Sequence, residues 1–295
     1  GAVWVLEEEV LFAAGRSSFL DDGIWLYRLN AMTGDKLSEQ RLWSYDPESG
    51  KGPDINGTRW IDGTLPDLLS SDGERIFMRH GVYGLDGTPL DEKRAHLYGI
   101  TGFLDNTWWH RTYWLFAEEE YGGWGGWWQM GNMMPSGRLM AVDDGTIYGF
   151  GRDFLPSGNA GQWRTGEDYV LYRCAQTPEA IEAEPELDKR GNPRKPSPKK
   201  RMYEYDWSNG PGLEVRALVK ADANLFAAGP VGNTTHSIVA HRGGEGSVLR
   251  VFSAEDGNTL HSVKLDALPV FDGMAAAEGK LLVALEDGTV QCMAP

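Results

Sequence analysis

The sequence predicts an all-β chain that folds as a β-propeller, in which four-stranded antiparallel sheets called blades follow one another. The pentapeptide LFAAG occurs at residues 11–15 and again at 225–229, and each copy is followed by a second strand pattern and a turn, at residues 23–37 and 247–260. Such recurring units are typical of a propeller, because each unit buries its sheet face against the next. The 38 glycines also suit a protein with many turns.

The first repeat has the alternation of a strand that is covered on both sides. Trp25, Tyr27 and Leu29 would share one face of a sheet, and Leu26 lies on the other face beside Arg28. Both faces are therefore largely apolar, which favours a sheet packed between two neighbours.

Glycine-containing turns separate the expected strands, because glycine supplies the positive φ that a tight hairpin turn needs. These turns include Thr33-Gly34, Asp256-Gly257 and Asp287-Gly288. The same turn and strand pattern recurs at residues 71–78, 144–150 and 279–290. The pattern predicts antiparallel hairpins along the chain.

The length sets the number of blades. With blades of about 40–50 residues, the 295 residues accommodate about five of them. We expect residues 1–295 to form a single propeller domain or a propeller fragment. The apolar run at residues 2–6 keeps a second alternative open, in which the chain is part of a larger seven- or eight-bladed propeller completed by the rest of a longer protein or by another chain.

The charge of the chain argues against two classes of partner. A formal charge of −15 and a pI near 4.8 argue against binding to nucleic acid or to an anionic membrane surface. No segment approaches the length of an apolar membrane span, so we expect no membrane insertion. Cys174 and Cys292 each fall in an expected strand, and the sequence leaves open whether they pair.

One segment departs from this composition. Residues 176–201 contain five prolines, with an acidic half followed by a basic half. Such a sequence buries too little apolar surface to order itself, so we expect a flexible insertion on the surface. A second interpretation is a docking tail for an acidic partner. Its basic residues would be Lys195, Lys199, Lys200 and Arg201.

The region 103–138 is the richest in aromatic side chains, and glycines are interleaved among them. Freely turning backbone that presents flat rings suits a stacking platform for a sugar or a planar cofactor. The alternative is that the rings wedge between neighbouring blades as core. Two dipeptides, His110-Arg111 and Arg79-His80, could hold a carboxylate or phosphate, or could pack against the rings as cation–π partners. The ligand- or partner-binding candidates are Trp108, Trp109, His110, Arg111, Trp114, Trp124, Trp127, Trp128, Arg79 and His80.

The sequence predicts no catalytic residue and no metal ligand. It contains no nucleophile elbow, phosphate-binding loop, zinc-protease motif or haem-attachment motif. Acidic pairs at Asp21-Asp22, Asp105-Asn106 and Asp143-Asp144 lack the spacing of a calcium loop. Turn chemistry explains them better, because Asp and Asn bond their own backbone at strand junctions.

Residues 29–37 and 252–260 resemble the repeat of pyrroloquinoline-quinone-type (PQQ-type) propellers, a quinoprotein-like family that includes outer-membrane-assembly-factor-like members. The tryptophan that ends the motif in quinoprotein dehydrogenases is replaced here, with Ser38 or Glu39 and His261 or Ser262 near its place. More specifically, residues 14–23, 102–114 and 269–276 resemble the C-terminal half of large planctomycete-type members of that family. The resemblance implies a bacterial protein in the periplasm or outside the cell.

Two classes of function follow. The first is a non-catalytic scaffold that needs no cofactor and binds another polypeptide, the rest of a larger parent protein or a glycan through the aromatic surface. The alternative is a PQQ-dependent oxidoreductase of the alcohol dehydrogenase type, which would need a stacking tryptophan, a calcium ion and an aspartate base. The absence of an assembled site in the sequence favours the scaffold.

Overall fold

The computed structural model describes residues 3–6, 8–15, 18, 23–43, 48–51, 69–78, 81–99, 114–118, 131–154, 169–179, 181, 187, 189–192, 201–232 and 237–294. These residues belong to two compact units, Gly1–Met130 and Gly131–Pro295, and each unit is described by itself.

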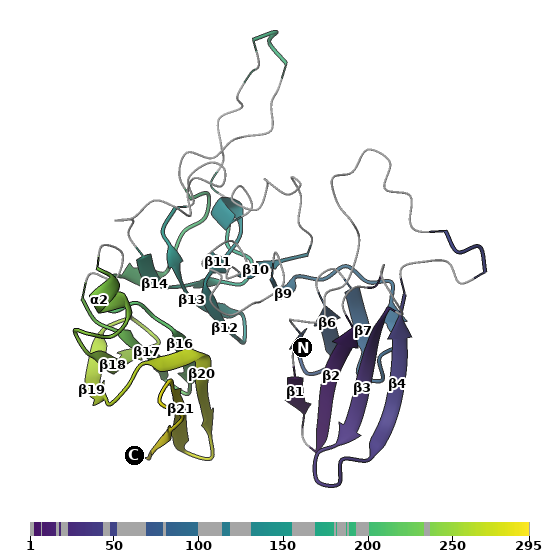
Figure 1. Cartoon of the computed structure of the whole chain (residues 1–295). Helices are drawn as coiled ribbons and strands as arrows, with labels where there is room; N and C mark the ends of the chain where they lie inside the picture. Colours follow the sequence, from purple (N-terminus) through teal and green to yellow (C-terminus); the bar gives the residue numbers. More distant parts are fainter. Residues whose placement is uncertain are drawn as a thin grey trace. The chain divides into compact units, whose positions relative to one another are not determined.

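The first unit contains two four-stranded sheets, which we call S1 and S2 (Figure 1). S1 is formed by β1 (Val3–Leu6), β2 (Glu9–Gly15), β3 (Ile24–Asn30) and β4 (Lys36–Leu42). S2 is formed by β5 (Ser70–Ser71), β6 (Arg75–Met78), β7 (Gly81–Gly84) and β8 (Pro89–Leu90). Two further strands, β9 (His96–Gly99) and β10 (Trp114–Ala117), pair antiparallel.

The second unit contains three sheets, S3 to S5. S3 is formed by β12 (Leu139–Asp143), β13 (Thr146–Arg152), β14 (Tyr169–Ala175) and β15 (Trp207–Asn209). S4 is formed by β16 (Ala217–Ala221), β17 (Asn224–Pro230), β18 (Ser247–Ser253) and β19 (Thr259–Leu265). S5 is formed by β20 (Pro269–Ala277), β21 (Lys280–Leu285) and β22 (Val290–Met293). Outside these sheets, the described elements include β11 (Ser136–Gly137) and the short helix α2 (Ile238–His241).

In S1 to S5 the strands follow one another in chain order, and each pairs antiparallel with the next. This meander is the strand order of a propeller blade. The predicted all-β fold of four-stranded antiparallel blades is therefore confirmed. The described residues supply four four-stranded sheets, the three-stranded S5 and the β9–β10 pair, in keeping with about five blades.

The first strands of successive sheets lie side by side in the second unit, in the order β12, β16 and β20. At one end, the backbone N–H of Asp272 in β20 donates to the carbonyl of Arg216, 2.8 Å away, just before β16. At the other end, Lys220 of β16 forms an ion pair with Asp143 of β12. Arg138 and Glu214, which precede β12 and β16, also form an ion pair, so these two strands run in the same direction, as the inner strands of neighbouring blades do.

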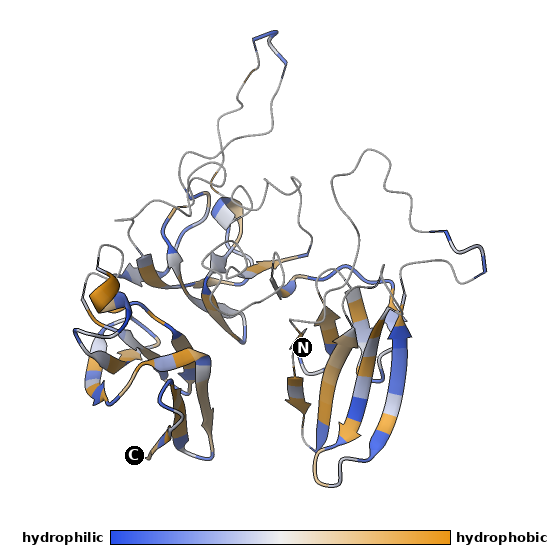
Figure 2. Ribbon diagram, in the orientation of Figure 1, coloured by the Kyte–Doolittle hydropathy of each residue, from blue (hydrophilic) through white to orange (hydrophobic). Residues whose placement is uncertain are grey.

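Apolar side chains fill the space between successive sheets. One core joins S1 to S2 and contains Leu11, Leu26 and Ile76. Further cores join S3 to S4 and S4 to S5, as expected when each repeat buries its face against the next. Figure 2 shows that β1 and β2 are mainly hydrophobic, whereas the outer strand β4 is mainly hydrophilic.

The predicted turns have the expected geometry. Gly34, Gly257 and Gly288 adopt φ values of 76°, 73° and 87°. Beside Gly288, the Asp287 carboxylate accepts hydrogen bonds from the Thr289 hydroxyl and backbone N–H, which lower its pKa. Gly145, with φ 68°, closes the β12–β13 turn after Asp143-Asp144, and the Asp143 carboxylate accepts hydrogen bonds from both Lys220 and the backbone of Asp144, which lower its pKa. The other two acidic pairs lie outside the described residues.

The repeated pentapeptide does not occupy the same place in the two sheets. Leu11 lies opposite Arg28 and packs towards S2, whereas Leu225 lies opposite Phe252 and packs towards S3. The pairs Glu9–Asn30 and Asn224–Ser253 are equivalent in the two sheets. Leu11 follows Glu9 by two residues, whereas Leu225 follows Asn224 by one, so the second copy begins one residue earlier in its strand. Because side chains alternate across a strand, this shift sends identical residues to opposite faces.

Cys174 and Cys292 are both free thiols. Burial raises the pKa of Cys174 to about 12, whereas Cys292 lies exposed in β22. Within the described parts of the chain, no helix is both long and apolar enough to cross a membrane.

Candidate interaction site

Nine of the ten binding candidates from the sequence lie outside the described residues. The exception is Trp114, which begins β10 opposite Gly99 and is half-buried. The aromatic platform at residues 103–138 therefore stays a prediction.

A different apolar surface covers one side of S1. Val3 and Val5 in β1 are 65% and 60% exposed, and their cross-strand partners Phe12 and Val10 lie on the same side. The register continues these rows to Tyr27 and Leu29 in β3. We call this side the S1 open face. It consists of Val3, Val5, Val10, Phe12, Trp25, Tyr27 and Leu29.

Ring stacking orders the S1 open face. Phe12 and Tyr27 stack with centroids 5.1 Å apart, and Trp25 lies 6.4 Å from Tyr27. The guanidinium of Arg41 lies 5.8 Å from the Trp25 ring and 3.6 Å from the Trp43 ring. Flat rings and an arginine held in place lose little conformational entropy on binding, which suits a protein interface.

The equivalent side of S4 is buried. The repeat places Leu218 where S1 has Val3, Leu225 where it has Val10, and Phe252 where it has Leu29. These three residues are at most 7% exposed, because S3 packs over them. The S1 open face thus occupies the repeat position that receives the preceding sheet.

A second feature of that contact is a tryptophan that docks on a turn. Trp207 in the outer strand of S3 donates from Nε1 to the carbonyl of Ala254, 3.3 Å away, and Asn209 Nδ2 donates to the carbonyl of Gly257 at 2.6 Å. Asn30 and Asp35 form the same backbone hydrogen bonds in S1 as Ser253 and Asn258 do in S4. The S1 turn therefore offers the same docking geometry.

Charged residues gather at one end of the second unit, around the starts of β12 and β16. We call the group the charged rim; it consists of Arg138, Glu214, Arg216, His241 and Glu286. Glu214 accepts from Arg138 at 3.3 Å and contacts His241 Nδ1 at 3.0 Å. Arg216 donates to Glu286 at 2.7 Å and to the His241 carbonyl at the end of α2 at 2.8 Å. These contacts link all three sheets of the unit, so we interpret the rim as a structural tie between them.

Asp272 lies next to the rim in a bulge of β20, with a φ of 56°. Its side chain keeps access to solvent, yet the protein around it raises its pKa from 3.8 to about 6 by desolvation. Between about pH 4 and pH 6, the Asp272 carboxyl is therefore protonated to a greater extent in the folded state than in the unfolded state. The contribution of Asp272 to stability should therefore fall as pH rises from about 4 to 6.

We expect Asp272→Asn to stabilise the chain at pH 8 by up to about 1 kcal/mol, because solvent screens part of the desolvation cost. Urea unfolding at pH 4 and pH 8 measures the change. The control is Asp222→Asn, since Asp222 has a similar φ of 47° in the exposed β16–β17 turn. A gain at position 272 that is the same at both pH values would show a backbone effect and contradict the titration.

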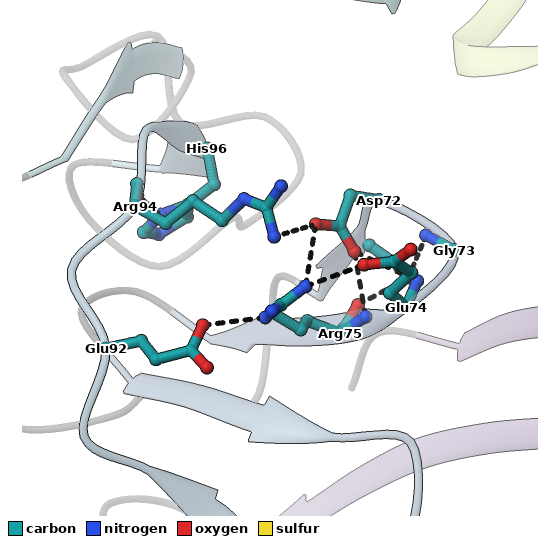
Figure 3. A network of polar contacts seen from close by, with 8 residues as sticks. Asp72, Gly73, Glu74, Arg75, Glu92, Arg94 and His96 are labelled. Carbon is teal, nitrogen blue, oxygen red and sulfur yellow. Dashed lines mark hydrogen bonds and ion pairs between the residues drawn. The ribbon is translucent and has the colours of Figure 1, made fainter.

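A polar network ties the β5–β6 turn of the first unit to the segment before β9 (Figure 3). Arg75 contacts Glu92 at 2.8 Å and Glu74 at 2.9 Å, and Asp72 contacts Arg94 at 3.2 Å. Nδ1 of the buried His96 ring donates a hydrogen bond to the Arg94 carbonyl, 2.7 Å away. Pairs this exposed contribute little stability, so the network mainly fixes the path of the chain.

The end of the proline-rich insertion is anchored. Arg201 forms an ion pair with Asp153, donates to the carbonyl of Tyr203 at 2.7 Å, and stacks 3.4 Å over Tyr205. Tyr205 in turn stacks on Tyr172 at 4.3 Å. Arg201 is thus engaged inside the chain, which argues against its role in a docking tail. Lys195, Lys199 and Lys200 lie outside the described residues.

Among the residues that the structure describes, no group of three or more His, Cys, Asp or Glu side chains is arranged to hold a metal ion.

No protein-family model matches the chain, and no curated protein matches it. Among solved structures, the chain is similar to the crystal structure of BamB from Moraxella catarrhalis, with 10% sequence identity, over 99% of this chain and 68% of that chain, and a TM-score of 0.42.

Proposed function

We propose that this chain is a non-catalytic interaction scaffold of the β-propeller type that binds another polypeptide. The single observation that carries the proposal is the S1 open face. Its residues alternate as in a sheet covered on both sides, and S2 covers only the opposite side. Contiguous apolar surface of this kind marks a protein interface, because covering it removes apolar area from water.

The position of this face in the repeat defines what it binds. In S4 the same position receives a neighbouring sheet, with the Trp207 ring over the Gly257 turn. S1 keeps the apolar residues and the turn that such a contact uses. The scaffold therefore recognises a polypeptide surface rather than a small molecule.

The aromatic segment supplies a second surface in this proposal. Trp108, Trp109, His110, Arg111, Trp114, Trp124, Trp127 and Trp128, with Arg79 and His80, would present rings and donors to a partner. Replacing Trp127 and Trp128 together by alanine should abolish partner binding and leave the far-UV circular dichroism unchanged. Loss of the β signal would show instead that these rings are core.

By its resemblance to quinoprotein-like propellers, the scaffold would work in the bacterial periplasm or outside the cell without a bound cofactor. The planctomycete-type relationship belongs to the same proposal. It rests on residues 14–23, 102–114 and 269–276.

Native mass spectrometry of the chain from its natural source tests the function. We expect a second polypeptide chain in the complex, and hydroxyl-radical footprinting should show Trp25 and Tyr27 protected until that polypeptide is removed. A bound mass that matches a quinone with calcium would support an oxidoreductase and overturn the scaffold. A chain without any bound polypeptide would also overturn it.

A further inference from the structure

One carboxylate of the second unit lies beside the charged rim and pairs with none of its cations. The backbone N–H of Asp272 donates to the carbonyl of Arg216, 2.8 Å away, so the side chain of Asp272 adjoins the rim. None of the described residues forms a hydrogen bond or an ion pair with the Asp272 carboxylate, and desolvation alone raises its pKa. The two arginines and the histidine of the rim are engaged by other acceptors. A cation for Asp272 therefore has to come from outside the rim.

The backbone holds Asp272 in a tight bulge. β20 pairs with β21 at Pro269 and again at Met274, with a register shift between the two. Asp272 has a φ of 56°, and a Cβ at Gly273 would lie 2.9 Å from the Cβ of Val270. The Asp272 side chain is exposed, yet the surrounding protein desolvates its carboxyl group. An ion pair formed there is screened less by water than a pair on an open surface.

Apolar side chains from two elements flank this carboxylate. Val270 in the bulge is 39% exposed, and Ile238 and Val239 in α2 are 61% and 58% exposed. Arg216 joins the two elements, because its carbonyl accepts from Asp272 and its guanidinium donates to the last carbonyl of α2. A carboxylate among exposed apolar groups matches a long basic side chain, which carries a charged head on an apolar stem.

We propose that Asp272 binds a lysine or arginine side chain of the partner polypeptide, whose apolar stem lies against Val270 and α2. The inference rests on the proposed function and adds a contact on the second unit. Ionisation of Asp272 costs free energy in the chain alone, since no cation offsets the desolvation. A basic side chain from the partner removes this cost on binding, so the carboxylate favours a basic partner over a neutral one.

Charge favours another polypeptide as the source of this cation. The chain has 43 acidic residues and only 28 lysines and arginines, for a formal charge of −15. A basic segment of a partner is attracted to such a chain before contact, and the attraction is oriented by carboxylates that lack a cation. Asp272 is a carboxylate of this kind.

Carbon-detected NMR of the Asp272 carboxyl group over a range of pH tests this inference in the full chain. Without a probe, the titration should give a pKa of about 6. The probe is a capped tripeptide with lysine between two leucines. It should lower the pKa of Asp272 towards the ordinary value of 3.8, because a nearby cation stabilises the carboxylate. A matched tripeptide with glutamine in place of lysine should leave the pKa unchanged.

The affinity for the lysine tripeptide should follow the ionised fraction of Asp272. It should fall about tenfold from pH 7 to pH 5, since a carboxyl with a pKa of about 6 loses its charge over this range. Asp272→Asn should weaken binding at pH 7 by about tenfold and remove the pH dependence. Asp222→Asn is the matched control, because Asp222 has a similar φ of 47° in an exposed turn and the same charge is removed. It should bind the tripeptide like the wild type.

Three results would overturn the inference. A pKa near 3.8 without any probe would show that Asp272 already has a cation within the chain. A pKa that the lysine tripeptide leaves unchanged, or that both tripeptides lower equally, would show that no basic side chain is recognised. Equal losses of affinity in Asp272→Asn and Asp222→Asn would show attraction by net charge alone. None of them touches the proposed function if native mass spectrometry finds a bound polypeptide. Conversely, a chain from its natural source without any bound polypeptide would end both proposals.

Discussion

Replacing Gly257 by alanine should destabilise the chain by about 2–4 kcal/mol, the sum of a backbone cost and a packing cost. Gly257 has a φ of 73°, where an L side chain is strained. A Cβ there would also lie 2.6 Å from Cε3 of Trp207, a ring held by its hydrogen bond to the Ala254 carbonyl. Urea unfolding measures the loss.

Gly34→Ala separates the two costs. Gly34 occupies the equivalent turn of S1 with a φ of 76°, and none of the described residues lies within 4 Å of its Cβ position. This variant should lose only the backbone cost, about 1 kcal/mol. Equal losses in the two variants would show that Trp207 does not hold the turn of the next sheet.

The contact between Trp207 and the turn at Gly257 could not be predicted from the sequence. The motif along residues 252–260 has no tryptophan at its end, so nothing in the motif indicates a tryptophan contact. In the structure Trp207 of the preceding sheet packs against Gly257. The ring lies in an outer strand that follows a long insertion, so no fixed spacing connects it to the turn that it covers.

The turns and strands, in contrast, could be predicted from the sequence, because they depend on neighbouring residues. The Asp-Gly and Thr-Gly turns depend on residues next to one another, and the strands between them follow from alternation, so both were correctly predicted. Register is different, because it depends on turn length and on the facing strand. The copies of LFAAG at residues 11–15 and 225–229 therefore pointed to a true repeat but not to the one-residue shift between them.

The interaction site was predictable only in part. Alternation of Trp25, Tyr27 and Leu29 indicated an apolar face, and the sequence led us to expect a neighbour on it. Which side of a sheet exposes valines, as Val3 and Val5 are exposed here, depends on packing that each sequence unit alone does not reveal. The charged rim was missed for a related reason, since Arg138, Glu214 and Glu286 are far apart along the chain.

Leu218→Ala should destabilise the chain by about 2–5 kcal/mol, because it removes buried methyl groups and leaves a cavity between S3 and S4. Val3→Ala is the matched change at the equivalent position of the S1 open face. Val3 is 65% exposed and Leu218 only 7%, so this second variant should change the stability of the separate molecule by less than about 0.5 kcal/mol. Urea unfolding at low protein concentration compares the two.

The same pair distinguishes a face that awaits a partner from one that is merely exposed. If the S1 open face binds another polypeptide, Val3→Ala should weaken that binding while leaving the unfolding of the chain unchanged. A Val3→Ala variant that binds the polypeptide as tightly as the wild type would place the contact elsewhere. A Val3→Ala variant as unstable as Leu218→Ala would mean that β1 is already packed in the separate molecule, and the distinction between the two sheets would fail.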